Sequence, residues 1–230
     1  MTQPSPPMQP DLSKVSHPAS LIAGQDQIKN IIFDFGGVIC NLDFKRTERQ
    51  FLALGLQAFT PEYAASGARL FQDIETGVVS STEFRDKLRQ FFPHPVSDAQ
   101  IDDALNALLL DIPEPRIRVL EKLRKHYRIF LLSNSNEIHY LKYVEDFRRY
   151  GYHDFGDLFE KAYFSFHLGC KKPSPEIFTC VLKDAGLIPS ETLFIDDTLV
   201  HVEGAQSLGI QAHHLKIDQG EQFIDLFMQS

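Results

Sequence analysis

Three short apolar runs in the sequence each end in polar residues. They cover residues 30–33, 128–132 and 192–195, and they are followed by Asp34, by Ser133 and Asn134, and by Asp196 and Asp197. Runs of this length, rich in branched and aromatic side chains, are typical of strands that are buried on both faces. Gly36 and Gly37, just behind the first run, indicate a tight turn where that strand ends.

Segments between these runs carry apolar residues at helical spacing. Residues 115–126 and 175–185 show this pattern, and the second segment is followed by Gly186, a residue type that commonly ends helices. The alternation of strands and helices predicts an α/β fold with a parallel sheet and right-handed crossovers. Ligands of such sheets bind beyond the carboxyl ends of the strands, so the polar residues after the three runs should meet there.

The stretch between the first two strands has a different pattern. Residues 45–109 contain several helical segments and no convincing strand. Ser80 to Glu83 and Ser97 to Gln100 both match the capping box that begins a helix. We therefore expect a flexible tail over residues 1–27, a core over 28–44 and 110–230, and an inserted helical cap over 45–109.

Composition narrows the classes of partner. The formal net charge of −8 argues against nucleic acid or an anionic membrane as the main partner. A small anionic substrate is still compatible, because a metal ion and a few local cations can outweigh that charge. Three cysteines without zinc-site spacing predict reduced thiols and a cytoplasmic protein. No apolar run is long enough to span a membrane, and no obligate protein partner is evident.

The polar residues at the strand ends fit phosphoryl transfer, which needs an in-line nucleophile and neutralisation of the phosphoryl oxygens. Asp34 can attack phosphorus and also bind Mg²⁺, an ion that prefers oxygen ligands. The carbonyl of Gly36 and one or both of the paired acids Asp196 and Asp197 can complete the metal site. Lys172 can screen the repulsion between Asp34 and the phosphate.

Phosphate oxygens need hydrogen-bond donors as well, and Ser133 and Asn134 can supply them. Each of these groups alone has an ordinary structural explanation. An aspartate after a strand often caps a turn or helix, and Ser-Asn is a common turn pair. Their order along the chain and their shared placement at one edge of a sheet favour a functional interpretation.

These residues resemble, in the right order from residue 28 to the C-terminus, the four motifs of the haloacid dehalogenase (HAD) superfamily. The match is strongest over residues 169–178 and 192–209. Within the superfamily the chain looks most similar to the bacterial α-D-glucose-1-phosphate phosphatases and to the phosphatase-like N-terminal domains of epoxide hydrolases. The resemblance implies a Rossmann-like core with an α-helical cap.

The same resemblance implies a set of roles. Asp34 would be the nucleophile and form an aspartyl-phosphate, Ser133 and Lys172 would bind phosphate, and Asp197 with Asp196 would hold Mg²⁺. The substrate would be a small phosphorylated metabolite, with glucose 1-phosphate as the leading example.

The resemblance also implies properties of the cap loop and of one peptide bond. Glu75 and Gly77 match a cap loop that faces the crevice, so they are expected to influence substrate specificity. The peptide bond between Lys172 and Pro173 is cis in related proteins, which implies a cis bond here.

Two positions depart from the family pattern. Gly36 stands where most phosphatases of the superfamily have a second aspartate, which protonates the leaving group and later activates water. Val200 and His201 stand where relatives often have an acid or amide that supports the metal site. For His201 we favour a solvent-facing helix position over a role behind the metal site.

Two other functions stay open. A phosphate- and Mg²⁺-binding protein with little or no turnover would explain the missing acid at position 36. A dehalogenase that needs no metal would use the same nucleophile, although it would have no use for the paired acids Asp196 and Asp197.

Overall fold

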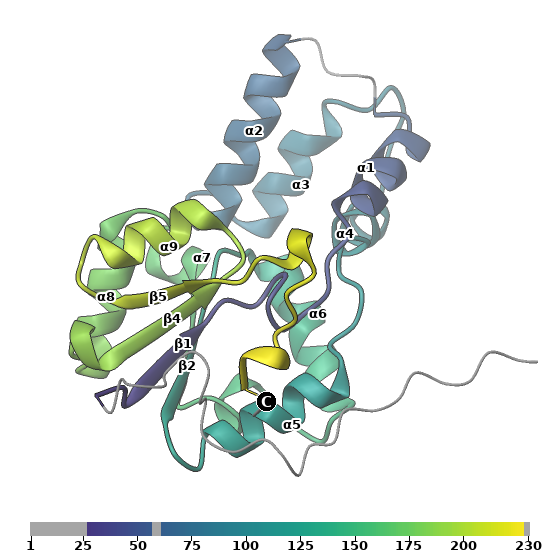
Figure 1. The fold of residues 1–230 in the computed structure, drawn as a ribbon. Helices are drawn as coiled ribbons and strands as arrows, with labels where there is room; N and C mark the ends of the chain where they lie inside the picture. The colour runs from purple at the N-terminus through teal and green to yellow at the C-terminus, as the bar shows by residue number, and fades with distance from the viewer. Residues whose placement is uncertain (1–26, 57–60, 228–230) are drawn as a thin grey trace, which may run out of the picture.

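Five parallel strands form the central sheet in the part of the chain that the structure describes. The computed structural model describes residues 27–56 and 61–227, and the expected tail lies outside them apart from Gln27. In the spatial order β3-β2-β1-β4-β5 (Figure 1), the strands are β3 Lys161–Phe164, β2 Arg128–Ser133, β1 Asn30–Phe33, β4 Thr192–Asp196 and β5 Gln211–His214. The prediction of an α/β fold with a parallel sheet is confirmed.

Helices cover both faces of the sheet, because alternate strand residues point to opposite sides. Ile31, Leu131 and Ile195 face one layer, which holds α5, α6 and the C-terminal segment, whereas Ile32 and Phe194 face the other, which holds α8 and α9. The helices are α5 Glu114–Leu123, α6 Glu137–Arg148, α7 Ser165–Leu168, α8 Pro175–Ala185 and α9 Leu199–Gln206, and the 3₁₀ turns are Phe155–Asp157, Pro189–Glu191, Ile217–Gln219 and Asp225–Phe227.

The two edge strands were not predicted from the sequence. β3 has the sequence Lys-Ala-Tyr-Phe with an exposed first residue, and β5 has Gln-Ala-His-His with every residue half-buried. An edge strand needs no continuous apolar run, because solvent reaches one of its sides. The expected helix over 175–185 coincides with α8, and Gly186 ends it in a left-handed conformation, as predicted.

Within the described residues, four helices lie between β1 and β2 in the chain. They are α1 Phe44–Ala53, α2 Pro61–Glu75, α3 Ser81–Arg89 and α4 Asp98–Asn106. Both predicted capping boxes are present, at Ser80 and Ser97. Leu42 lies just before these four helices and Leu109 just after them. The backbones of the two residues form an antiparallel bridge.

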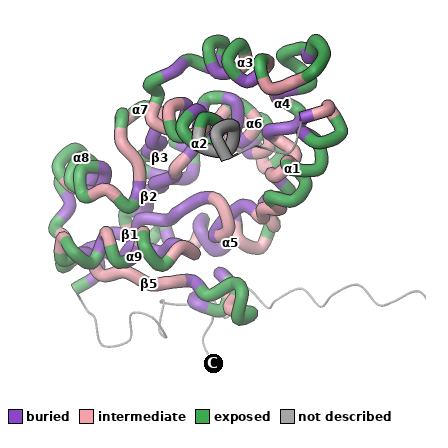
Figure 2. Tube along the Cα trace, turned by 90° about the horizontal axis from the view of Figure 1, so that it is seen from above, coloured by how far each residue is buried: buried purple, intermediate pink, exposed green. Residues whose placement is uncertain are grey.

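These four helices have an apolar cluster of their own, centred on residues such as Phe84 and Ile101, which are fully buried. Ile138 of α6 joins that cluster from the sheet domain. Viewed from above, β1 and β2 are buried in the middle, and the helices around them carry long exposed stretches (Figure 2). Over the described residues, no helix is both long enough and apolar enough to cross a membrane.

Candidate active site at the carboxyl ends of the strands

Three carboxylates meet at the carboxyl ends of the central strands. Asp34 follows β1, Asp196 ends β4 and Asp197 comes next in the chain. β1 and β4 are neighbours in register, and the backbone N–H of Asp34 donates to the carbonyl of Ile195 at 2.9 Å. Each acid offers an oxygen, and these oxygens lie within 4.8 Å of one another. Adjacent parallel strands therefore bring together acids that are more than 160 positions apart.

Lys172 is the cation of this cluster. Its Nζ lies 2.6 Å from Oδ1 of Asp34, 2.7 Å from Oδ2 of Asp196 and 2.8 Å from the carbonyl oxygen of Leu132. The side chain is completely buried. These three acceptors engage all three N–H groups of the ammonium. Lys172 therefore holds the two acids in place, and in this arrangement it has no further N–H for a phosphate.

Burial and charge set the protonation of the cluster. Burial raises the pKa of Asp34 to about 7, against the ammonium of Lys172 and with help from the carboxylate of Asp196. Burial would also raise the pKa of Asp196, but Lys172 and His201 overcome it and lower that pKa to about 2. Burial and the neighbouring Asp196 raise the pKa of Asp197. Burial opposes the charge on Lys172, yet the two acids raise its pKa above the usual value.

Asn134 clamps the backbone of Lys172. Its side-chain oxygen accepts from the Lys172 N–H at 2.9 Å, and its amide nitrogen donates to the Lys172 carbonyl at 2.9 Å. The side-chain amide of Asn134 is therefore already bonded through both its oxygen and its nitrogen. The expected donation from Asn134 to phosphate stays a prediction. The peptide bond between Lys172 and Pro173 is cis, as the resemblance implied.

The glycine turn after β1 lies directly against Asp197. A Cβ on Gly37, where φ is +81°, would come within 2.3 Å of Oδ2 of Asp197. A Cβ on Gly36 would meet Cδ1 of Leu42 at 2.7 Å. Ser133 is buried at the end of β2, the strand that pairs in parallel with β1. Glycine at position 37 thus lets the turn approach the acids more closely than any other residue could.

His201 was expected to face solvent, and this interpretation is wrong. Its Nδ1 lies 3.1 Å from both carboxylate oxygens of Asp196, and its side chain is only 17% exposed. The first turn of α9 carries the imidazole back over the end of β4. Asp196 also accepts the backbone N–H of Thr198 at 2.8 Å, so both of its oxygens have partners.

Two more contacts in this region were missed. Nε2 of His214, at the end of β5, lies 3.0 Å from the carbonyl oxygen of Asp197. Nζ of Lys171 lies 2.6 Å from Oε2 of Glu75, one of the two cap residues expected to influence specificity. The sequence offered one signal for each residue: Lys171 is adjacent to Lys172, and His201 follows Asp196 by five positions. Neither signal indicates which acid the side chain would contact.

The arrangement fits a divalent cation. Three carboxylates face one ammonium, so the cluster carries excess negative charge, and all of its donor atoms are oxygens. Mg²⁺ is held in proteins by such sets of one or two carboxylates with further oxygen ligands. The Gly37 turn also lies close to Asp197, so its backbone borders this cluster.

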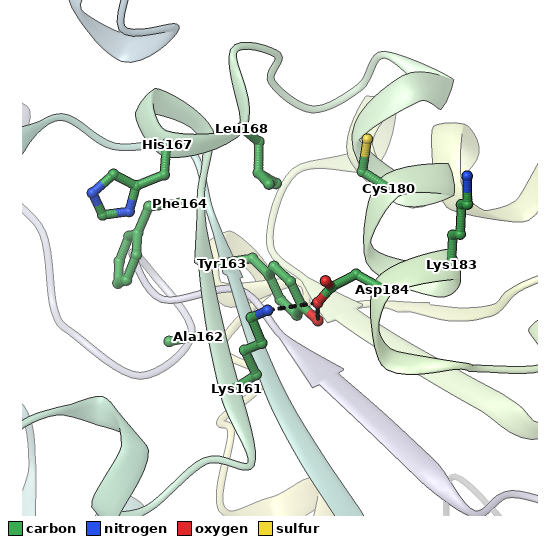
Figure 3. Close-up of a pocket in the computed structure, with 9 residues that line it drawn as sticks. All are labelled: Lys161, Ala162, Tyr163, Phe164, His167, Leu168, Cys180, Lys183 and Asp184. Carbon is green, nitrogen blue, oxygen red and sulfur yellow. Dashed lines mark hydrogen bonds and ion pairs between the residues drawn. The ribbon is translucent and has the colours of Figure 1, made fainter.

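A separate cavity of about 550 Å³ lies along the edge strand β3, between α7 and α8. Its nine lining residues include none of the site residues predicted from the sequence. Figure 3 shows Lys161 and Tyr163 both reaching Asp184, at 2.7 Å and 2.6 Å. The acids at the carboxyl ends of β1 and β4 are therefore distinct from this cavity.

Comparison with known proteins identifies related sequences and structures. A family model described as a haloacid dehalogenase-like hydrolase matches residues 28–209. D-ribitol-5-phosphate phosphatase from Bacteroides thetaiotaomicron is 34% identical over 188 residues, which are 80% of this chain and 90% of that protein.

Solved structures agree with that match. A haloacid dehalogenase family enzyme from Bacteroides thetaiotaomicron is 40% identical with a TM-score of 0.79, over 88% of this chain and 99% of that one. A mutant structure of the same enzyme, in complex with magnesium and inorganic phosphate, has a TM-score of 0.74 at 40% identity, over 82% of this chain and 94% of that one.

Proposed function

The chain belongs to the haloacid dehalogenase-like hydrolases, and we propose that it is a Mg²⁺-dependent phosphatase acting on a small phosphorylated metabolite. The observation that carries the proposal is the ammonium of Lys172, 2.6 Å from Asp34 and 2.7 Å from Asp196, with Asp197 alongside. This cluster combines a nucleophile, a cation and metal ligands, as phosphoryl transfer requires. The magnesium complexes of the related Bacteroides enzyme support the choice of metal.

Asp34 is the nucleophile in this proposal. One of its oxygens attacks phosphorus, the bond to the leaving oxygen breaks, and an aspartyl-phosphate forms. Water then attacks that phosphorus, which releases inorganic phosphate and restores the carboxylate. Because Lys172 holds Oδ1 of Asp34 at 2.6 Å, it fixes the orientation of the other oxygen as well. Asp34 must be ionised to attack, and so it must lose the proton that its raised pKa favours.

The ligands of the metal are Asp34, Asp196, Asp197 and the carbonyl of Gly36 in this proposal. When bound, Mg²⁺ neutralises the charge that builds up on the phosphoryl oxygens. Ser133 lies at the end of β2, where its hydroxyl can donate to the same oxygens. Ser133 and Lys172 serve as the phosphate-binding residues in this proposal: Ser133 donates its hydroxyl, whereas Lys172, whose N–H groups are already engaged, attracts the phosphate through its charge. The clamp from Asn134 keeps the loop of Lys172 in position.

A sugar or sugar-alcohol phosphate is the substrate class that we favour. The similarity to D-ribitol-5-phosphate phosphatase supports an open-chain polyol phosphate, and glucose 1-phosphate is the second compound to assay. The two differ in their leaving groups, because an anomeric oxygen tolerates negative charge better than a primary alkoxide. Gly36 supplies no side-chain acid to protonate either one, so this difference bears directly on the rate.

Hydrolysis of p-nitrophenyl phosphate, with Mg²⁺ and with EDTA, tests the proposal. We expect turnover that EDTA abolishes and that Asp34→Asn lowers by roughly three or more orders of magnitude, as loss of a nucleophile does. Turnover that persists in EDTA contradicts the metal requirement. A wild-type protein that binds Mg²⁺ and phosphate without turnover supports the binding-protein alternative instead. Release of halide from a 2-haloacid without metal would favour the dehalogenase alternative.

A further inference from the structure

Lys171 connects the loop before α8 to the cap. Its Nζ lies 2.6 Å from Oε2 of Glu75, which is the last residue of α2. The two side chains are 32% and 30% exposed, so they lie at a partly open rim. An ion pair this exposed contributes little to folding stability. The main effect of the ion pair is therefore to fix the positions of the Lys171 ammonium and the Glu75 carboxylate.

The loop that carries Lys171 is held rigidly from the core. The next residue, Lys172, is bound through its backbone to Asn134 at 2.9 Å on both its N–H and its carbonyl. On the other side, a Cβ on Gly204 of α9 would come within 2.6 Å of the carbonyl oxygen of Pro173. Lys171 thus projects from a fixed backbone, and the reach of its side chain limits where Glu75 can lie.

The cap meets the core at the same place. α2 runs down from the outer end of the cap toward α7 (Figure 1). Just beyond it, Gly77 has φ of +67°, and a Cβ there would lie 2.3 Å from the carbonyl oxygen of Phe166. The segment from Glu75 to Gly77 therefore packs against the backbone of α7, with the Glu75 carboxylate held by Lys171.

Glu75 and Asp34 both act on one buried phenol, that of Tyr143. Burial raises the pKa of the Tyr143 phenol, and the negative charges of Asp34 and Glu75 both add to the rise. Tyr143 packs edge-on against Phe35, the neighbour of Asp34, with ring centroids 4.4 Å apart. Tyr143 thus links the surroundings of Glu75 to those of Asp34.

We propose that Lys171 is a positioning residue for substrate specificity: it holds the Glu75 carboxylate over the site, where that carboxylate accepts hydrogen bonds from the hydroxyl groups of a polyol leaving group. This inference rests on the phosphatase function proposed above. A carboxylate accepts hydrogen bonds from two or more hydroxyls and donates none, which suits a chain of alcohols better than an aromatic ring. Without Lys171, the same carboxylate would rotate freely into solvent.

A double-mutant cycle tests the proposal. Lys171→Met, Glu75→Gln and the double variant are assayed with D-ribitol 5-phosphate and with p-nitrophenyl phosphate, which has no hydroxyl groups. We expect each single variant to lower the ratio of the two kcat/KM values by about tenfold or more, since charge-assisted hydrogen bonds are lost. The loss should appear mainly in KM for the polyol phosphate. The double variant should be no worse than the worse single one, because the two residues act as a unit.

Lys161→Met is the matched control. Lys161 forms a similar exposed ion pair with Asp184, at 2.7 Å, at the separate cavity beside β3 (Figure 3). Its substitution should leave the ratio unchanged. An unchanged ratio in Lys171→Met, or additive losses in the double variant, would overturn the proposal. A wild-type protein that hydrolyses p-nitrophenyl phosphate but not D-ribitol 5-phosphate would also overturn it. Absence of wild-type turnover with both phosphate esters would instead overturn the phosphatase function itself, so the two failures are distinguishable.

Discussion

His201 faces Asp196 with its Nδ1 3.1 Å from both carboxylate oxygens. The imidazole stands on the first turn of α9, and Asp196 is completely buried at the end of β4. An N–H at Nδ1 can donate to either oxygen, so His201 and Lys172 hold this acid from two directions. We propose that His201 supports a metal site at Asp196, in the place where the family resemblance implies an acid or amide.

We expect His201→Ala to weaken Mg²⁺ binding by about 10- to 100-fold, as loss of a group that orients a metal ligand usually does. His201→Asn should retain most of the affinity, because its amide nitrogen can replace Nδ1, whereas His201→Gln places its nitrogen near Nε2. Calorimetric titration with Mg²⁺ measures the difference. His153→Ala is the control, since His153 lies 3.3 Å from Asp157 but is 95% exposed. Unchanged affinity in His201→Ala would contradict this role.

The sequence predicted the central strands better than the edges, for a physical reason. β1, β2 and β4 are covered by helices on both faces, so each contains an unbroken run of apolar residues. β3 and β5 border solvent, and their patterns resemble those of loops. Hydrogen bonding to a neighbouring strand defines an edge strand, and a single-chain pattern does not reveal that pairing.

The acids of the site were predictable because each directly follows an apolar run. Asp34 and Asp196 come to one edge of the sheet as soon as their strands pair in parallel. The partners of His201 and Lys171 were not predictable in the same way. The contact of His201 depends on how α9 turns back over β4, and that of Lys171 on where the cap packs. Such contacts belong to tertiary packing and leave no periodic signal.

Protonation of Asp34 should make Mg²⁺ binding depend on pH. Burial raises the pKa of this carboxyl from its ordinary 3.8 to about 7. Below pH 7 the metal-free protein holds a proton there, which must leave before the carboxylate can bind a cation. We expect the apparent affinity for Mg²⁺ to fall about tenfold per pH unit below 7 and to level off above it.

The same shift has a consequence for stability without metal. Because the folded pKa of Asp34 is raised, its contribution to stability is fully present below pH 3.8 and is lost as pH rises through about 7. The increase in Tm on adding Mg²⁺ should therefore grow from pH 6 to pH 8. Thermal unfolding with Mg²⁺ and with EDTA across this range measures it. An increase that is the same at every pH would mean that Asp34 is ionised throughout.

Asp196 and Asp197 should respond differently to substitution. Asp196 is completely buried and bonded to Lys172, His201 and the Thr198 N–H. Asp196→Asn therefore removes one of the two carboxylates that pair with the buried ammonium of Lys172. Breaking a buried pair costs about 3–5 kcal/mol, which corresponds to roughly 10 °C in Tm for a chain of this size.

Asp197 is half-buried, and the neighbouring Asp196 adds to the rise in its pKa. Asp197→Asn should therefore leave Tm in EDTA unchanged or slightly higher while abolishing Mg²⁺ binding. Thermal unfolding in EDTA and calorimetric titration separate the two effects. Similar losses of Tm in both variants would show that Asp196 and Asp197 stabilise the folded protein to the same extent.

Restoring an acid at position 36 requires space as well as charge. A Cβ on Gly36 would lie 2.7 Å from Cδ1 of Leu42, the movable end of a flexible side chain. Leu42 also bridges Leu109 where the chain returns from the cap, so displacing it could disturb the cap. We therefore expect Gly36→Asp to be best tolerated together with Leu42→Ala, and Leu42→Ala alone is the proper reference.

In that background, an aspartate at position 36 should protonate the leaving oxygen, a contribution typically worth about 10²–10⁴-fold. The gain should be larger for alkyl phosphates than for aryl phosphates, because aryl oxides leave readily without a proton. Without the acid, kcat/KM should fall steeply as the leaving-group pKa rises. With it, the slope should flatten. A flat slope in the Leu42→Ala reference, with chemistry rate-limiting, would show that another residue or a water already supplies the proton and that Gly36 imposes no such limit.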